Sequence, residues 1–157
     1  MTDPAVRKLL VNLLAWEDAH VGFDDAVAGI PENKRGTKAP GLHSPWELVE
    51  HLRITQHDIL NFSVNPGYEE LKWPQDYWPS TPAPASAAAW DDSVAQFGLD
   101  REALQKLAAD PAVELTAKIP HGDGQTYLRE IVLAADHAAY HVGQLVLVRQ
   151  VLGIWKR

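Results

Sequence analysis

The chain has 157 residues, of which 46% are hydrophobic and 22% charged, and its formal net charge is -7 at pH 7. This length and composition predict one globular domain over residues 1–157. The negative charge argues against nucleic acid or an anionic membrane surface as a partner. Because the chain has no cysteine, disulfides, zinc–thiolate sites and cysteine nucleophiles are excluded.

The N-terminus lacks the basic-then-apolar pattern of a signal peptide, so we expect a cytoplasmic protein. The most apolar stretch runs from Thr126 to Trp155, but Asp136, two histidines and Arg149 interrupt it. This interruption argues against a membrane-spanning segment.

The first predicted helix begins after Asp3, whose side chain can cap it, and Pro4 suits its first turn. Apolar residues at helical spacing extend it to about Gly29: Val6, Leu9, Leu10, Leu13, Phe23 and Val27. His20 lies on this apolar stripe and is therefore expected to face the interior. Residues 31–42 are rich in proline, glycine and lysine and predict a loop.

The second predicted helix begins at Ser44-Pro45-Trp46-Glu47, where the serine hydroxyl can cap the helix and Glu47 can reach back to the serine backbone. Its inner face carries Leu48, Leu52, Thr55, Ile59 and Phe62. His51 lies beside this face, and Asp58 lies on it two turns later. His57 lies on another side of the helix, well away from this inner face.

Residues 64–85 show no periodicity and combine five prolines with four large aromatic residues. A loop of this length in a compact domain is usually functional or a crossover between elements. Two interpretations of the aromatic residues between Trp73 and Trp78 stay open: they wall a substrate pocket, or they simply pack against the helices.

Residues 86–109 predict a third helix with an interruption at Gly98, and residues 113–119 alternate as in an extended segment. Thr126 caps a fourth helix, which contains His137 and His141. Since a helix repeats every 3.6 residues, this pair shares one face and can hold one metal ion. Gln144 continues the same inward stripe.

Four amphipathic helices predict an all-α fold, a four-helix bundle. The loop between helices one and two is of moderate length, so these helices should run antiparallel. The loop between helices two and three is long enough to cross the bundle, so those two should run parallel. The resulting order is up-down-down-up. At about 1.5 Å per residue, His20, His51 and the pair His137 and His141 lie at similar heights in such a bundle.

The spacing alone leaves open that His137 and His141 are core or helix-surface histidines bonded to neighbours. One metalloenzyme class is excluded, because Ala138 stands where a zincin has its catalytic glutamate.

Three segments together resemble the DinB-like superfamily: Ala19-His20-Val21-Gly22-Phe23-Asp24, Ser44-Pro45-Trp46-Glu47-Leu48-Val49-Glu50-His51-Leu52, and His137-Ala138-Ala139-Tyr140-His141-Val142-Gly143-Gln144-Leu145. The resemblance covers nearly the whole chain. It implies a bundle, often a homodimer, with a divalent metal held by one histidine of the second helix and two of the fourth. The matching positions are His51, His137 and His141. The family includes thiol-dependent S-transferases and mycothiol-dependent isomerases.

Three neutral imidazoles suit Zn or Ni first, with Fe, Co or Mn as alternatives, and leave positions for water or substrate. Such a metal lowers the pKa of water or holds a substrate thiol as thiolate. We therefore expect a metal-dependent thiol S-transferase or hydrolase acting on a small molecule, with a low-molecular-weight thiol as a further candidate cofactor. His20, Asp58 and Gln144 are candidates to support the ligand histidines through hydrogen bonds.

Two other hypotheses stay open. In one, the protein is a non-catalytic, stress-related binding protein whose metal only staples the second and fourth helices, with its coordination saturated by a fourth ligand such as His20. In the other, the chain is a dimeric bundle that holds no metal. For His20 itself, support of a ligand, proton shuttling and plain core packing are three open roles.

Overall fold

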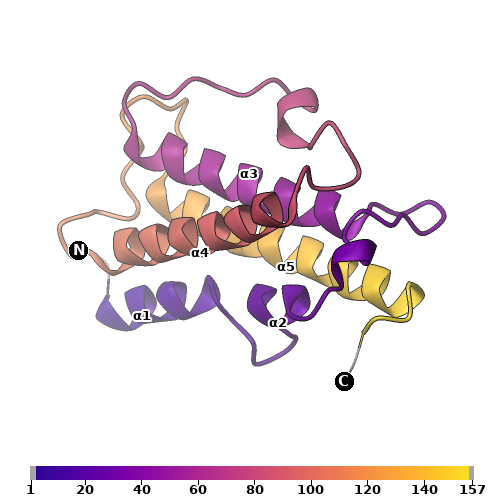
Figure 1. Ribbon diagram of the computed structural model, residues 1–157. Helices are drawn as coiled ribbons and strands as arrows, with labels where there is room; N and C mark the ends of the chain where they lie inside the picture. Colours follow the sequence, from indigo (N-terminus) through magenta and orange to yellow (C-terminus); the bar gives the residue numbers. More distant parts are fainter. Residues whose placement is uncertain (1–2, 156–157) are drawn as a thin grey trace.

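The structure is a computed structural model that describes residues 3–155 as helices joined by loops (Figure 1). The helices are α1 (Pro4–Leu13), α2 (Phe23–Val27), α3 (Pro45–Val64), α4 (Ala87–Ala109) and α5 (Tyr127–Val151), with two 3-10 turns, η1 (Glu32–Lys34) and η2 (Gln75–Tyr77). No strand occurs within residues 3–155, and the segment predicted to be extended forms only an isolated bridge between Lys118 and Thr126. The all-α class is confirmed.

The three long helices begin at the capping residues that the sequence predicts. The Ser44 hydroxyl accepts a hydrogen bond from the Glu47 backbone at 3.1 Å, and the Glu47 carboxylate accepts one from the Ser44 backbone at 2.7 Å. The hydroxyls of Ser86 and Thr126 cap α4 and α5 in the same way. The predicted interruption at Gly98 is wrong, because α4 continues through it.

The prediction of one long first helix is also wrong. α1 ends at Leu13, and α2 begins only at Phe23. The apolar spacing is missing between these residues, where a continued helix would carry Glu17 and Asp18 one turn after Leu13 and Leu14. The break lets α1 pack mainly against α4 while α2 packs against α5.

Buried side chains secure the short helix α2. Phe23 of α2 stacks on Phe97 of α4, with ring centroids 3.9 Å apart. The buried Arg149 guanidinium donates to the backbone carbonyls of Asp25 and Ala26 at 3.2 and 2.6 Å. These carbonyls lie at the C-terminal end of α2, where a helix leaves its acceptors without partners of its own.

α3 is the central helix, with α4 and α5 packed against it. α3 and α4 begin at the same end of the molecule, and α5 begins at the opposite end (Figure 1). The core has two apolar clusters, one around Leu52, Phe97 and Leu145 and the other around Ile59, Leu104 and Ile131.

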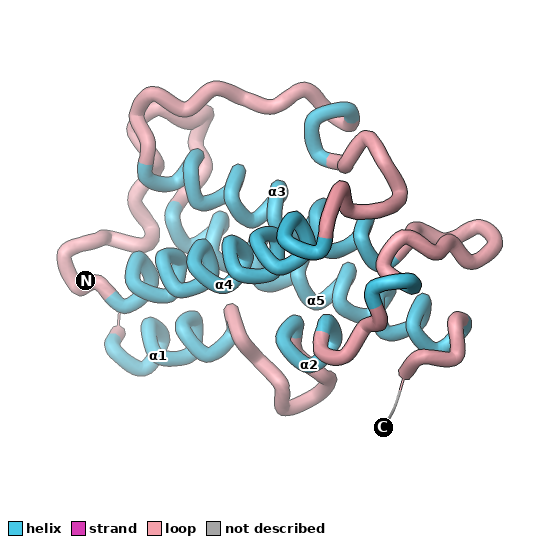
Figure 2. Tube along the Cα trace, viewed as in Figure 1, coloured by secondary structure: helices cyan, strands magenta, loops and turns pink. Residues whose placement is uncertain are grey.

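The loop between α3 and α4, which we call the strap (residues 65–86), returns along α3 from its C-terminal end to its N-terminal end (Figure 2). Two side chains of α3 and its capping serine bond to it in order: Asp58 to Tyr68 and Tyr77, His51 to the Tyr77 backbone, and Ser44 to the Pro82 backbone. The strap therefore covers the face of α3 that carries His51.

Among residues 3–155, α5 is the one helix whose length and mean hydropathy would allow it to cross a membrane. Core helices of proteins outside the membrane pass the same test. α5 places Ile131, Leu145 and Val148 in the interior against the other helices, as such a core helix does.

Candidate metal centre

Three histidines from two helices meet at one point. The Nε2 atom of His51 on α3 lies 3.1 Å from Nε2 of His137 and 3.2 Å from Nε2 of His141, both on α5. The three candidate ligand atoms all lie within 4.8 Å of one another. His51 is only 2% exposed, and the other two rings are buried or half-buried.

These separations fit one shared metal ion. Zinc–nitrogen bonds of about 2.0–2.1 Å in tetrahedral geometry place two ligand nitrogens about 3.3 Å apart. Imidazole nitrogens are common ligands of Zn, Ni, Fe and Co, so the donor set suits a transition metal rather than Ca or Mg.

Hydrogen bonds to the other ring nitrogen fix which atom carries the proton in two of the three rings, those of His51 and His141. His51 donates from Nδ1 to the Tyr77 backbone carbonyl at 2.7 Å. A carbonyl can only accept, so in the neutral ring Nε2 keeps a free lone pair. His141 Nδ1 lies 2.8 Å from Gln144 Oε1 and donates to it. Partners of this kind orient metal-binding histidines.

Burial keeps the cluster uncharged. It lowers the pKa of His51 to about 4, against the raising effect of the Tyr77 hydrogen bond, and neighbouring His141 lowers it further. Burial lowers the pKa of His137 to about 3, with added repulsion from the other two rings. The pKa of His141 is lowered by burial as well. Near neutral pH all three rings are in the unprotonated form that binds metals.

The strap supplies an aromatic wall beside the cluster. The Trp78 indole stacks on the His51 ring, with centroids 3.8 Å apart and planes 2° from parallel. His43 stacks on Trp78 as well, at 4.2 Å and 20°. Trp78 packs against the core cluster around Leu52 and Phe97, as the packing interpretation expects, whereas Trp73 is 70% exposed.

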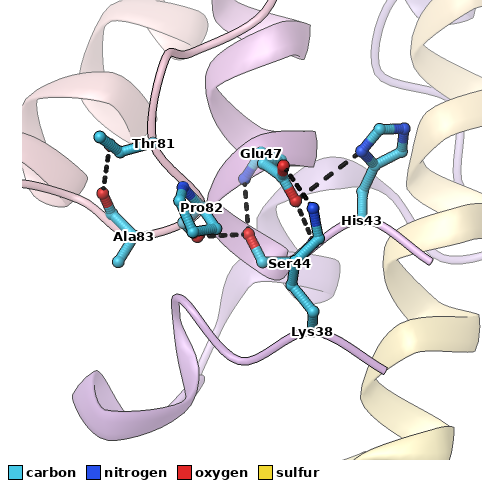
Figure 3. A network of polar contacts seen from close by, with 7 residues as sticks. All are labelled: Lys38, His43, Ser44, Glu47, Thr81, Pro82 and Ala83. Atoms are coloured by element: carbon cyan, nitrogen blue, oxygen red, sulfur yellow. Dashed lines mark hydrogen bonds and ion pairs between the residues drawn. The ribbon is translucent and has the colours of Figure 1, made fainter. Parts of the chain in front are cut away.

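The end of the strap is anchored at the start of α3, as Figure 3 shows. Ser44 lies between Glu47 and Pro82 there, and its hydroxyl donates to the Pro82 carbonyl at 2.5 Å. Glu47 also accepts from Lys38 at 2.8 Å and lies 3.7 Å from His43 Nδ1. The capping serine thus holds both the helix and the strap.

The three predicted supporting residues have different positions. Gln144 touches the cluster directly through His141. Asp58 is linked to the cluster only through Tyr77, whose carbonyl accepts from His51. The Asp58 carboxylate accepts from the hydroxyls of Tyr68 and Tyr77, at 2.9 and 2.8 Å. The prediction that His20 faces the interior is wrong. It lies in the break between α1 and α2, is exposed, and bonds to the adjacent Val21 carbonyl at 2.9 Å.

Two neighbours of the cluster could not be found from sequence reasoning: the Tyr77 carbonyl, which bonds to His51, and His43, which stacks on Trp78. The Tyr77 carbonyl is a backbone atom, and every residue carries one, so nothing in the sequence marks it. His43 precedes the α3 cap and shows no periodic relation to His51. The aromatic, proline-rich character of residues 73–79 was the one available signal for Trp78.

Comparison with known proteins gives one match. A family model described as the DinB superfamily matches residues 15–145, which include all three histidines of the cluster. No curated protein and no solved structure matches the chain.

Proposed function

The chain belongs to the DinB superfamily, and from this premise we propose that it is a metal-dependent enzyme that acts on a small molecule. The observation that carries the proposal is the convergence of the Nε2 atoms of three neutral imidazoles in a buried cluster. His51, His137 and His141 would hold one divalent ion, with Zn or Ni preferred and Fe, Co or Mn as alternatives. When bound, the metal supplies Lewis-acid chemistry that lowers the pKa of a water or a thiol.

The reaction we propose is thiol S-transfer or hydrolysis. Because the chain has no cysteine, a thiol nucleophile has to come from a substrate or from a low-molecular-weight thiol cofactor. The likeness of the chain to a superfamily that includes thiol-dependent S-transferases favours S-transfer. The residues of this chain bind and orient: Trp78 and Tyr77 hold the His51 ring, and Gln144 holds His141.

The competing hypothesis is a metal that only staples α3 to α5. It requires a fourth protein ligand to complete the coordination. Within residues 3–155, the candidate metal-binding group contains three residues, and exposed His20 is not among them. A three-ligand set with positions left for other molecules supports the enzymatic hypothesis.

The test is the metal content of protein purified without a histidine tag, measured by elemental mass spectrometry. We expect near-stoichiometric metal in the wild type and its loss in His137→Ala. His57→Ala is the matched control, because His57 is an exposed histidine of α3 that bonds to Asp100. Wild-type protein that stays metal-free after incubation with Zn and Ni would overturn the proposal. Metal-loaded protein is then assayed with thiols and electrophiles, and separately for hydrolysis.

We also propose that the fold is a four-helix bundle of up-down-down-up order, in which α1 and α2 together take the place of the first helix. We propose further that the protein is a cytoplasmic homodimer. Hydrogen bonds from Arg7 to the Ala108 carbonyl and from Gln105 to the Val11 carbonyl support opposite directions for α1 and α4. Exposed apolar residues on α5 support a dimer: Val132, Leu147 and Val151. Light scattering in solution tests the assembly.

A further inference from the structure

A polar cavity of about 370 Å³ lies along the same two helices as the histidine cluster. α3 contributes Asp58 to its wall, α5 contributes Glu130 and Leu133, and the strap contributes Tyr68 and Tyr77. The cavity therefore has walls from the helices that carry the histidines and from the segment that covers them.

The cavity lies close to the histidine cluster along both helices. Leu133 lies one turn before His137 on α5, about 6 Å along the helix axis, and Asp58 lies two turns after His51 on α3, about 10 Å away. Tyr77 belongs to both places, because its carbonyl accepts from His51 and its side chain lines the cavity.

Hydrogen-bond acceptors dominate the cavity wall. Glu130 is 2% exposed, and the one hydrogen bond recorded for its carboxylate comes from Arg129 to Oε1, at 2.6 Å. Gln125 Oε1 is buried and has no hydrogen-bond partner in the structure. A buried acceptor without a partner costs free energy, so a ligand that donates hydrogen bonds here would be stabilised.

The charge of the wall matches this preference for donors. Four carboxylates line the cavity, those of Asp58, Glu70, Asp123 and Glu130, and Arg129 is the one lysine or arginine among the lining residues. An excess of negative charge around the unpartnered Gln125 oxygen favours a cationic donor over a neutral or anionic group.

We propose that this cavity is a recognition subsite for a cationic nitrogen group, an ammonium or guanidinium, of the small-molecule substrate. Glu130 and Gln125 accept its hydrogen bonds, and the reacting end of the same molecule lies at the histidine cluster. The assignment of the cation to a substrate rests on the proposed function, whereas the cation preference of the cavity does not.

The first arm of the test uses metal-free protein and three probes with the same six-carbon chain: aminohexanol, hexanediol and hydroxyhexanoate. Binding is followed by NMR shifts of the backbone amides of the lining residues Gly122 and Asp123. Because hydrogen bonds to charged groups are the stronger ones, we expect aminohexanol to bind at least about tenfold more tightly than hexanediol. Hydroxyhexanoate should be the weakest of the three.

Variants locate the preference in the cavity. Glu130→Gln should remove the advantage of aminohexanol, and Gln125→Glu should increase it because it adds a charge at the unpartnered acceptor. The control is Glu102→Gln, which makes the same charge change at an exposed position of α4. Equal binding of the three probes, absence of binding, or an unchanged preference in natively folded Glu130→Gln would overturn the proposal.

The second arm links the cavity to the histidine cluster. Cobalt-loaded protein is titrated with aminohexanethiol and with mercaptohexanol, and thiolate binding is read from the cobalt absorption. We expect at least about tenfold tighter binding of aminohexanethiol in the wild type, and equal binding in Glu130→Gln. Equal binding in the wild type would overturn the substrate assignment. Failure to bind cobalt would instead overturn the proposed function and leave the first arm to decide the cation preference.

Discussion

The indole of Trp78 lies flat on the imidazole of His51, with centroids 3.8 Å apart and planes 2° from parallel. The neighbouring Tyr77 carbonyl accepts the Nδ1 proton of the same ring. Two consecutive residues of the strap thus fix both the plane and the tautomer of the α3 histidine. The geometry of the cluster therefore depends on a loop as well as on the two helices.

Replacing Trp78 should weaken metal binding. Trp78→Leu removes the ring that stacks on His51. Mutation of residues that orient metal ligands typically lowers metal affinity 10–100-fold, so we expect the dissociation constant for Zn to rise about tenfold. Competition with a chromophoric chelator measures it. Trp73→Leu is the control in the same strap, since Trp73 is largely exposed. Equal affinities of the two variants would contradict the role assigned to Trp78.

Gln144 should affect metal affinity through its hydrogen bond to His141. Gln144→Leu removes the acceptor of the Nδ1 proton, and we expect a 10–100-fold loss of Zn affinity, as is typical for such partners. Gln144→Glu should keep the affinity or increase it, because a carboxylate is a stronger acceptor. The comparison variant is Gln150→Leu, an exposed position of α5. An unaffected Gln144→Leu protein would show that His141 needs no support.

Tyr68 should ionise only at strongly alkaline pH. Burial and then the hydrogen bond to Asp58 raise its pKa to about 12, whereas a tyrosine of the unfolded chain ionises near pH 10. The stabilisation from the neutral hydroxyl is therefore fully present below about pH 10 and is lost as the pH rises toward 12. The difference between ultraviolet titrations of wild type and Tyr68→Phe isolates this group.

The Asp58→Asn background tests the cause of that shift. Without the carboxylate, the Tyr68 hydroxyl loses its charged acceptor and the repulsion that disfavours the phenolate. The midpoint of the difference titration should then fall below 12 but stay above the ordinary value of about 10, because burial, the larger cause, remains. A midpoint that stays near 12 would assign the shift to burial alone.

Ser44→Ala should destabilise the protein more than Ser86→Ala. Both lose a helix cap worth about 1 kcal/mol, but Ser44 also donates to the Pro82 carbonyl and so holds the strap. That second bond adds about 1 kcal/mol of expected loss. Urea unfolding measures both changes. Equal losses would mean that the contact between Ser44 and Pro82 contributes nothing to stability.

Local chemistry in the sequence predicted several features correctly. The caps at Ser44, Ser86 and Thr126 depend on hydrogen bonds within one turn, so a few consecutive residues determine them. The helical repeat likewise places His137 and His141 on one face, and the structure brings His51 to them. That third histidine was assigned through the family resemblance and not from spacing alone.

Only the tertiary structure decided the rest. The first helix breaks after Leu13, where Glu17 and Asp18 interrupt the apolar spacing, but the sequence does not say that its two halves pack against different partners, α4 and α5. The same break leaves His20 exposed. Contacts of Trp78 with His51, and the cavity around Glu130, join segments far apart in the chain. Periodicity and capping report on neighbours within a turn or two, whereas these features depend on which surfaces meet when the helices pack.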